Sequence, residues 1–396
     1  MNRFFVVTPI GFEETTLKDL QDIWPVLLGK DAQAHSFPFP KVEVLKGGLE
    51  FECEMFLGLQ LNFFLKTASR ILLRMTSFKT RDFPKFYQKI KGLPWNEYLP
   101  HGHVEWVVSA QKSRLNNEKR LQESAEKAFE DIFGKPTVKE TCASVFIRMD
   151  DDLCTISLDT SGEHLHKRGW TTLKGEAPLR ETIAAYLVKQ MMVGKTFEET
   201  SQVTLIDPMM GSGTFLTEAR SLTSGQFKRS FAFQKWKKCP KLLLSSSLAF
   251  NYKIPVRVPF AKYVGFDLAE EMIPVAQKNF SEVETQLQAV QRKDFAPAAT
   301  QFIGESSIIG EPFQLEGERW VISNPPYGER LTMALEEDGL ASVLSALIAK
   351  FKPQRIGLLY PDRDRLKRAP KGYKILAEIP VNNGGLRTMF TILTAV

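Results

Sequence analysis

The chain has 396 residues, of which 43% are hydrophobic and 25% charged, so it holds enough apolar material for folded domains and is not disordered throughout. Lys and Arg exceed Asp and Glu by 52 to 46, a net charge of +6 that by itself excludes little. No apolar run reaches the ~18 residues that a membrane helix needs, and Glu13 and Glu14 come too early for a secretory signal.

Length and cysteine usage add two further expectations. Domains usually contain about 100–200 residues, which predicts two or three domains in this chain. The four cysteines, at positions 53, 142, 154 and 239, show neither CxxC nor His-paired spacing. This pattern predicts free thiols in a reducing cytoplasm and no metal site. We therefore expect a cytoplasmic protein without a membrane partner, and we take it to be a monomer.

The first 160 residues mix strands and helices in an irregular order, which is typical of an α+β fold. Alternating or continuous short apolar patterns predict strands, and a 3.6-residue period predicts helices. The expected strands are 4–8, 42–44, 49–52, 70–75, 103–110, 145–149 and 154–159. The expected helices are 13–28, 54–65, 82–90 and 117–133.

After about residue 175, helices and short apolar strands alternate, which indicates an α/β domain with a mostly parallel sheet. The expected strands here are 202–207, 263–267, 320–323 and 356–360. The expected helices are 179–192, 213–222 and 268–280. The pattern thus changes from α+β to α/β along the chain.

The basic residues are concentrated in a few segments. Residues 220–262 contain ten Lys and Arg and no acid, and residues 66–91 contain eight and one acid. Such patches bind polyanions because they release counterions from phosphate, although they also occur as solvated surface. Aromatic residues interleave with the first patch, and we expect most of them to be core. The candidate phosphate contacts are Arg70, Arg74 and four lysines of the first patch, which are Lys235, Lys237, Lys238 and Lys241.

A glycine loop at 207–214 lies between an expected strand and an expected helix. Gly211 and Gly213 lack a Cβ and can adopt positive φ, so a ligand can approach the backbone there. The Walker lysine and the third glycine of the dinucleotide motif are missing, and a lone GxG is also found in plain tight turns. Asp267 ends the next strand, where an acid binds ribose hydroxyls or, alternatively, caps the following helix.

Asn324, Pro325, Pro326 and Tyr327 follow a buried-type strand. The prolines restrict the backbone, so the Asn324 amide and the Pro325 carbonyl present oxygens that accept hydrogen bonds from an amine. Tyr327 can stack on a planar base. Asn-Pro alone is a common turn, but the complete motif after the glycine loop and Asp267 is far more specific.

The order of these motifs, 207–214, 265–267 and 324–331, resembles that of the THUMP-containing class I methyltransferases, which use S-adenosylmethionine to methylate N2 of guanine in rRNA or tRNA. Residues 5–13 are similar to the ferredoxin-like opening of this family, and residues 65–74 and 93–95 are similar to its THUMP module. Residues 166–170 and 177–182 are similar to the segment that leads into its catalytic domain, and residues 229–236 are similar to its insertion. Met210 stands where the family often has Cys, and 302–317 cannot be aligned.

The resemblance implies an α+β N-terminal half, ferredoxin-like plus THUMP, followed by an α/β Rossmann-like class I methyltransferase domain. The implied domains are ferredoxin-like at 1–52, THUMP at 53–160, and catalytic at 161–396 with a basic insertion at 221–262. The implied catalytic residues are Asn324, Pro325, Pro326 and Tyr327. The implied RNA contacts are Arg70, Arg74 and the insertion lysines, which are Lys235, Lys237, Lys238 and Lys241. The implied S-adenosylmethionine site comprises Asp207, Met209, Gly211, Ser212, Gly213, Thr214, Asp267 and Asp294, the last meeting the adenine amine or being an ordinary acid beside a helix.

The resulting expectation is a metal-free transfer of a methyl group to the exocyclic N2 of a guanine, in 23S rRNA rather than tRNA because the 324–331 run looks most like the bacterial rRNA enzymes. Three alternatives use the same residues. They are a tRNA guanine-N2 methyltransferase, an adenine-N6 or glutamine-amide methyltransferase, and a non-catalytic RNA-binding assembly factor.

Overall fold

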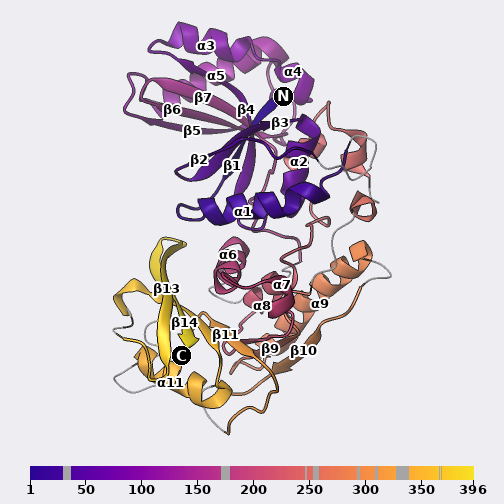
Figure 1. Cartoon of the computed structure of the whole chain (residues 1–396). Helices are drawn as coiled ribbons and strands as arrows, with labels where there is room; N and C mark the ends of the chain where they lie inside the picture. Colours follow the sequence, from indigo (N-terminus) through magenta and orange to yellow (C-terminus); the bar gives the residue numbers. More distant parts are fainter. Residues whose placement is uncertain are drawn as a thin grey trace. The chain divides into compact units, whose positions relative to one another are not determined.

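The computed structural model describes residues 1–396 except 30–36, 171–178, 246–247, 253–257, 292–294, 308–310, 327–338, 365 and 367. Internal contacts divide the chain into two compact units (Figure 1). The first unit comprises Met1–Lys167 and Arg229–Lys253, and the second comprises Arg168–Lys228 and Ile254–Val396. Among the described residues, none of the helices combines the length and apolarity needed to span a membrane.

The first unit is built on a seven-stranded sheet of order β2-β3-β1-β4-β7-β6-β5. Its strands are β1 (Asn2–Val7), β2 (Val42–Leu45), β3 (Gly48–Cys53), β4 (Arg70–Lys79), β5 (Glu105–Gln111), β6 (Ser144–Asp150) and β7 (Leu153–Asp159). Neighbouring strands are antiparallel except β5 and β6, which are parallel. The sheet continues across the expected boundary at 52 and 53, so the division into a ferredoxin-like and a THUMP part stays a proposal.

The described helices of this unit are α1 (Glu13–Ile23), α2 (Met55–Phe64), α3 (Phe83–Lys91), α4 (Trp95–Tyr98) and α5 (Glu118–Phe133). Helix α2 is mostly apolar, and residues 56–64 are buried. A Cβ on Gly58 would lie 2.2 Å from the Phe4 ring, so only glycine allows α2 to approach β1 this closely. Helix α5 is amphipathic, and the Asn117 side chain accepts a hydrogen bond from the Arg120 N–H at its start.

Residues 229–253 pack with the first unit, although we expected the basic insertion in the catalytic domain. They form the 3-10 turns η2 (Ala232–Lys235), η3 (Lys241–Leu244) and η4 (Leu248–Asn251). Phe231 and Phe233 meet the ring of Phe63 on α2 at centroid distances of 4.9 and 6.0 Å. The Tyr252 hydroxyl donates to Gln60 Oε1 at 2.8 Å. Burial of these aromatic side chains explains the association and confirms that most aromatics of the segment are core.

The second unit contains a seven-stranded sheet of order β10-β9-β8-β11-β12-β14-β13. Its strands are β8 (Thr204–Asp207), β9 (Lys262–Phe266), β10 (Ala299–Ile303), β11 (Arg319–Ser323), β12 (Arg355–Pro361), β13 (Tyr373–Asn383) and β14 (Leu386–Ala395). The first five in sheet order are parallel, and β14 is antiparallel to both of its neighbours. The expected α/β domain is confirmed, and β10, β13 and β14 were not predicted.

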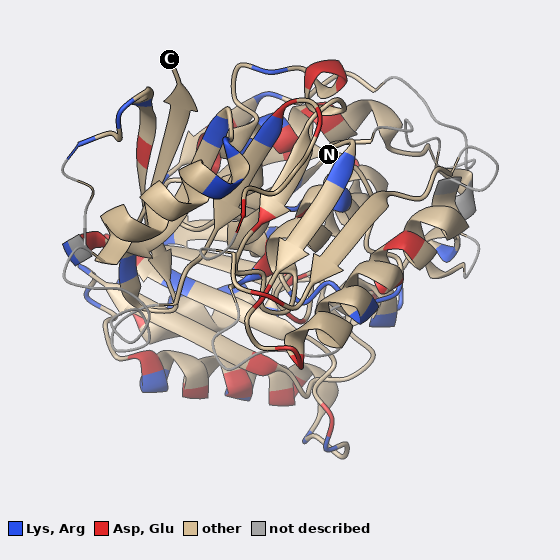
Figure 2. Ribbon diagram, turned by 90° about the horizontal axis from the view of Figure 1, so that it is seen from below, with Lys and Arg blue, Asp and Glu red and all other residues tan. Residues whose placement is uncertain are grey.

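The described helices of this unit are α6 (Glu181–Met191), α7 (Phe197–Thr200), α8 (Thr214–Arg220), α9 (Met272–Gln291) and α11 (Gly339–Phe351). The inner strands β8 and β12 are buried along their whole length and β11 is buried after its first residue, which explains their continuous apolar runs. Side chains of β8, β9, β11 and β12 form one core cluster with α11. Both signs of charge are spread over helices and loops of the ribbon (Figure 2).

Candidate functional site

The glycine loop joins β8 to Thr214, the first residue of α8. Gly211 has φ +50° and Gly213 has φ +77°, a region that side chains with a Cβ rarely adopt. A Cβ on Gly213 would lie 3.2 Å from the Cβ of Ala276 on α9, whereas a Cβ on Gly211 would meet no atom within 4 Å. Gly213 therefore permits close packing on α9, while Gly211 borders open space that a ligand can enter.

Hydrogen bonds to β9, to α9 and within the turn hold this loop in place. The Met210 N–H donates to the Phe266 carbonyl of β9 at 2.9 Å, and the Gly213 N–H donates to the Met210 carbonyl at 2.8 Å. The Asn279 side chain on α9 donates to the Ser212 carbonyl at 3.0 Å. The loop is thus preorganised by β9 and α9, and Met210 contributes to these bonds through its backbone and not its side chain.

Asp267 follows β9 and connects that strand to the glycine loop. Its Oδ2 accepts a hydrogen bond from the Gly211 N–H at 2.7 Å, and its Oδ1 accepts one from the Ala269 N–H at 2.9 Å. The side chain therefore caps its own turn and not α9, which begins at Met272. Each carboxylate oxygen has a second lone pair, so hydroxyl donors such as those of a ribose can still bind.

Asp207, the last residue of β8, is 2% exposed. Its Oδ1 accepts a hydrogen bond from the Met209 N–H at 3.2 Å. Burial raises the pKa of Asp207 well above its usual range, the Met209 N–H opposes this, and the nearby Asp267 carboxylate adds to it. A cationic amine next to Asp207 would therefore stabilise its ionised form. Met209 is partly buried and packs on the core cluster of this unit.

The Asn-Pro-Pro segment directly follows β11. Asn324 is partly exposed, Pro325 is buried and Pro326 is exposed. The buried Ser323 hydroxyl just before them has no hydrogen-bond partner within the described part of the chain. Tyr327 lies outside the described residues, so its expected role stays a prediction.

The strand order brings three of the predicted site residues to one edge of the sheet. β8 lies between β9 and β11 and is parallel to both, with Asp207 opposite Gly265. Asp207 ends β8, Asp267 follows β9 and Asn324 follows β11. This edge is the carboxyl edge, where open α/β sheets bind ligands at the point at which strand order reverses.

Sequence reasoning missed an acid at this same edge. β10 ends at Ile303, whose carbonyl accepts a hydrogen bond from the Asp267 N–H at 3.1 Å. Glu305 follows two residues later and lies 3.7 Å from the Nζ of Lys350. The short apolar run before Gly304 was the available signal, but it falls in the unaligned stretch 302–317. Asp294 lies outside the described residues and precedes β10 in sequence.

The two arginines predicted to contact RNA bind carboxylates within the first unit. Arg70 pairs with buried Asp159, whose pKa burial raises to about 6 even though Arg70 lowers it. The Arg74 Nε lies 2.8 Å from Glu50, and its guanidinium stacks on the ring of Phe5 at 4.1 Å. Both side chains are largely buried, and they join β4 to other strands of the same sheet.

The insertion lysines are exposed on the first unit. Lys235 pairs with Glu140 and Lys238 pairs with Glu97, each at 2.7 Å. Exposed ion pairs of this kind contribute only about 0–1 kcal/mol, so a phosphate can replace either carboxylate at little cost. The insertion lysines therefore remain the stronger candidates for RNA contact.

A seven-stranded sheet of this order, with a glycine loop after β8 and an acid after the neighbouring strand β9, is typical of the class I methyltransferase fold. Residues 168–390 match the model of the RMKL-like methyltransferase domain family, and the chain belongs to this family. The sequence-based prediction of a methyltransferase that uses S-adenosylmethionine is thereby confirmed at the level of the family.

Two relatives and one solved structure illustrate the similarity. The ribosomal RNA large subunit methyltransferase K/L of Psychromonas ingrahamii is 32% identical over 306 residues, which are 72% of this chain and 38% of that protein. The putative RNA methyltransferase YpsC of Bacillus subtilis is 29% identical over 345 residues, which are 82% of this chain and 78% of that protein. The structure of SMU.472, a putative methyltransferase complexed with SAH, is similar in fold, with a TM-score of 0.70, 23% identity and coverage of 100% of this chain and 98% of that one.

Proposed function

We propose that the protein transfers a methyl group from S-adenosylmethionine to the exocyclic N2 of a guanine in RNA, with 23S rRNA as the preferred substrate. The observation that carries the proposal is the placement of the glycine loop, Asp267 and Asn324 after three adjacent parallel strands. The chain spans 38% of the Psychromonas relative, whose name supports a large-subunit rRNA substrate. The name of the Bacillus relative supports RNA in general.

The residues at the carboxyl edge fit the cofactor. The open space beside Gly211 admits a ligand against the backbone, and the Asp267 carboxylate keeps lone pairs for ribose hydroxyls. Asp207 is buried, and a cationic amine of the cofactor would offset the cost of its charge. When bound, S-adenosylmethionine supplies an electrophilic methyl group on a positively charged sulfur.

The sheet offers a second candidate for the adenine contact. Asp294 precedes β10 in sequence, whereas Glu305 follows that strand at the edge where Asp267 lies. We therefore propose Glu305, beside Asp294, as an acid that can bind the adenine amine.

The Asn324 side-chain oxygen and the Pro325 carbonyl are proposed to accept hydrogen bonds from the amine of the target base. The lone pair of guanine N2 is delocalised into the ring, so the amine is a poor nucleophile. Two acceptors stabilise the positive charge that develops on nitrogen during attack, and they hold the amine in line with the methyl group. Tyr327 is proposed to stack on the base, which has to leave its helix or loop to enter the site.

The proposal is tested by mass spectrometry of nucleosides from 23S rRNA, 16S rRNA and tRNA of a strain that lacks the gene. We expect N2-methylguanosine to disappear from 23S rRNA and to return with the wild-type gene but not with Asn324→Ala. Loss from tRNA instead would favour the tRNA enzyme, and loss of N6-methyladenosine would refute the guanine assignment. An unchanged nucleoside profile, together with intact RNA binding, would favour a non-catalytic assembly factor.

A further inference from the structure

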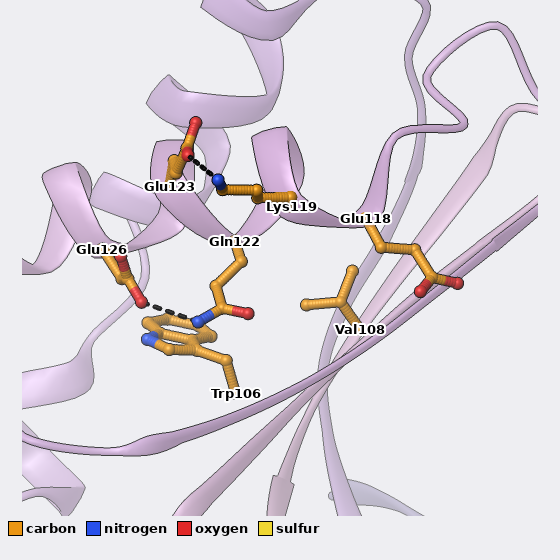
Figure 3. A pocket seen from close by; sticks show the side chains of 7 residues that line it. All are labelled: Trp106, Val108, Glu118, Lys119, Gln122, Glu123 and Glu126. Carbon is orange, nitrogen blue, oxygen red and sulfur yellow. Dashed lines mark hydrogen bonds and ion pairs between the residues drawn. The ribbon is translucent and has the colours of Figure 1, made fainter.

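A groove of about 590 Å³ lies between β5 and α5 in the first unit (Figure 3). Trp106 and Val108 of β5 form its apolar floor. Side chains of α5 form its polar wall, and they are Glu118, Lys119, Gln122, Glu123 and Glu126. None of these residues belongs to the candidate methyl-transfer site, and none is an insertion lysine.

The floor of the groove borders an open sheet edge. β5 is the last strand in the order of its sheet, as far as the described residues go. The Glu105 N–H donates toward β6 at 2.9 Å, whereas the Ala110 N–H donates to the Glu118 carboxylate at 3.2 Å. Because successive amides of a strand alternate in direction, those of Trp106 and Val108 point the same way as that of Ala110. These groups are available to pair with a further strand.

The wall of the groove carries negative charge. Three of its five side chains are carboxylates, and one is an ammonium group. Lys119 lies 4.0 Å from Glu123, and the Gln122 amide donates to Glu126 at 2.8 Å (Figure 3). The net charge repels RNA phosphates and attracts Lys and Arg side chains.

The groove is also rigid in its central part. The Trp106 ring packs edge-on against Phe129 of α5, with a centroid distance of 4.8 Å. The side chain of Asn117 caps the start of α5 at the end of the groove where Glu118 lies. A preformed groove loses little entropy when a strand binds, which favours the addition of an extended segment.

We propose that this groove binds an extended, lysine- or arginine-rich segment of a partner protein, which adds as a strand to β5. Its backbone pairs with the amides and carbonyls of Trp106 and Val108, and its basic side chains meet Glu123 and Glu126. A second copy of the chain would bring its own acidic groove to the contact, so charge argues against it. RNA is disfavoured for the same reason.

The test uses the full chain and a fluorescein-labelled peptide of alternating Lys and Val, about seven residues long to match β5. Fluorescence anisotropy measures its Kd for the wild type, for the double variant Glu123→Gln and Glu126→Gln, and for Glu130→Gln. Glu130 lies on α5 outside the groove and serves as the matched control. We expect about fivefold to tenfold weaker binding to the double variant and less than a twofold change in the control.

A second arm separates strand addition from plain charge attraction. Two further peptides carry methyl groups on every second backbone nitrogen, one on the odd and one on the even positions. Both keep the charge of the first peptide, but each loses the hydrogen-bond donors of one edge. The peptide that is methylated on the edge facing β5 should not bind. Equal binding of all peptides to all variants would overturn the proposal. The proposal would also be overturned if oligoadenylate RNA, and not the peptide, lost affinity in the double variant. It would likewise be overturned if sedimentation showed a wild-type dimer that dissociates in the double variant.

Discussion

The ion pair between Arg168 and Glu218 links the start of the second unit to α8, the helix that follows the glycine loop. The Arg168 Nη2 lies 3.1 Å from Glu218 Oε2, and its Nε donates to Oε1 at 3.3 Å. Both side chains are 0% exposed. We predict that Arg168→Met destabilises the second unit strongly, because it leaves the Glu218 charge buried without this partner.

The burial of both groups sets the size of the effect. Removing one partner of a buried pair costs about 3–5 kcal/mol, whereas replacing both by apolar side chains is often close to neutral. We therefore expect a loss of about 3–5 kcal/mol in the free energy of unfolding for Arg168→Met and for Glu218→Leu. The double variant should recover most of that loss, so the two effects are coupled and not additive.

Urea unfolding followed by circular dichroism measures these free energies, and hydrogen exchange of the α8 amides localises them to the second unit. Affinity for S-adenosylmethionine should fall in the single variants, because α8 positions the glycine loop. Losses below about 1 kcal/mol in both single variants, or a double variant that is destabilised by the sum of the two, would refute the reasoning.

Three further predictions follow from charges and thiols. The pKa of Asp207 is raised in the folded state, so folding favours the protonated carboxyl group. The stability that this protonated group contributes is fully present below about pH 4, and it is lost as the pH rises through the folded-state pKa of Asp207. Urea unfolding should thus show Asp207→Asn gaining stability relative to wild type with rising pH, and a difference independent of pH would contradict this. Replacing all four insertion lysines with Ala should lower the slope of log K against log salt for RNA by about 3, and an unchanged slope would place the contact elsewhere. Burial raises the pKa of Cys53 and Cys154 to about 12 and that of Cys239 to about 11, so iodoacetamide at pH 8 should label the partly exposed Cys239 before either of the others, as peptide mass mapping would show.

The site was predictable from sequence where local chemistry decides it. Gly211 and Gly213 are recognisable because the turn requires positive φ, and both have it. Asp267 and Asn324 are recognisable because each polar residue directly follows a buried apolar strand. The parallel order β9-β8-β11 then places them at the same edge, as alternation of strands and helices implied.

Features that depend on distant contacts were not predictable. The association of residues 229–253 with the first unit rests on packing of Phe231 against Phe63, and a sequence indicates that an aromatic is buried without indicating its partner. Arg70 likewise looks like an exposed basic residue until Asp159 is placed beside it. Glu305 was missed because β10 is short and only partly buried, so its apolar pattern is weak.

The central claim is that one edge of the sheet holds both the methyl donor and the target amine. Single-turnover methyl transfer to 23S rRNA, with the protein preloaded with S-adenosylmethionine, tests it most directly. Asn324→Ala should bind the donor and the RNA as the wild type does but transfer the methyl group at least about a hundredfold more slowly. Transfer at the wild-type rate by that variant, with Asp267→Ala still binding the donor normally, would show that the chemistry takes place elsewhere.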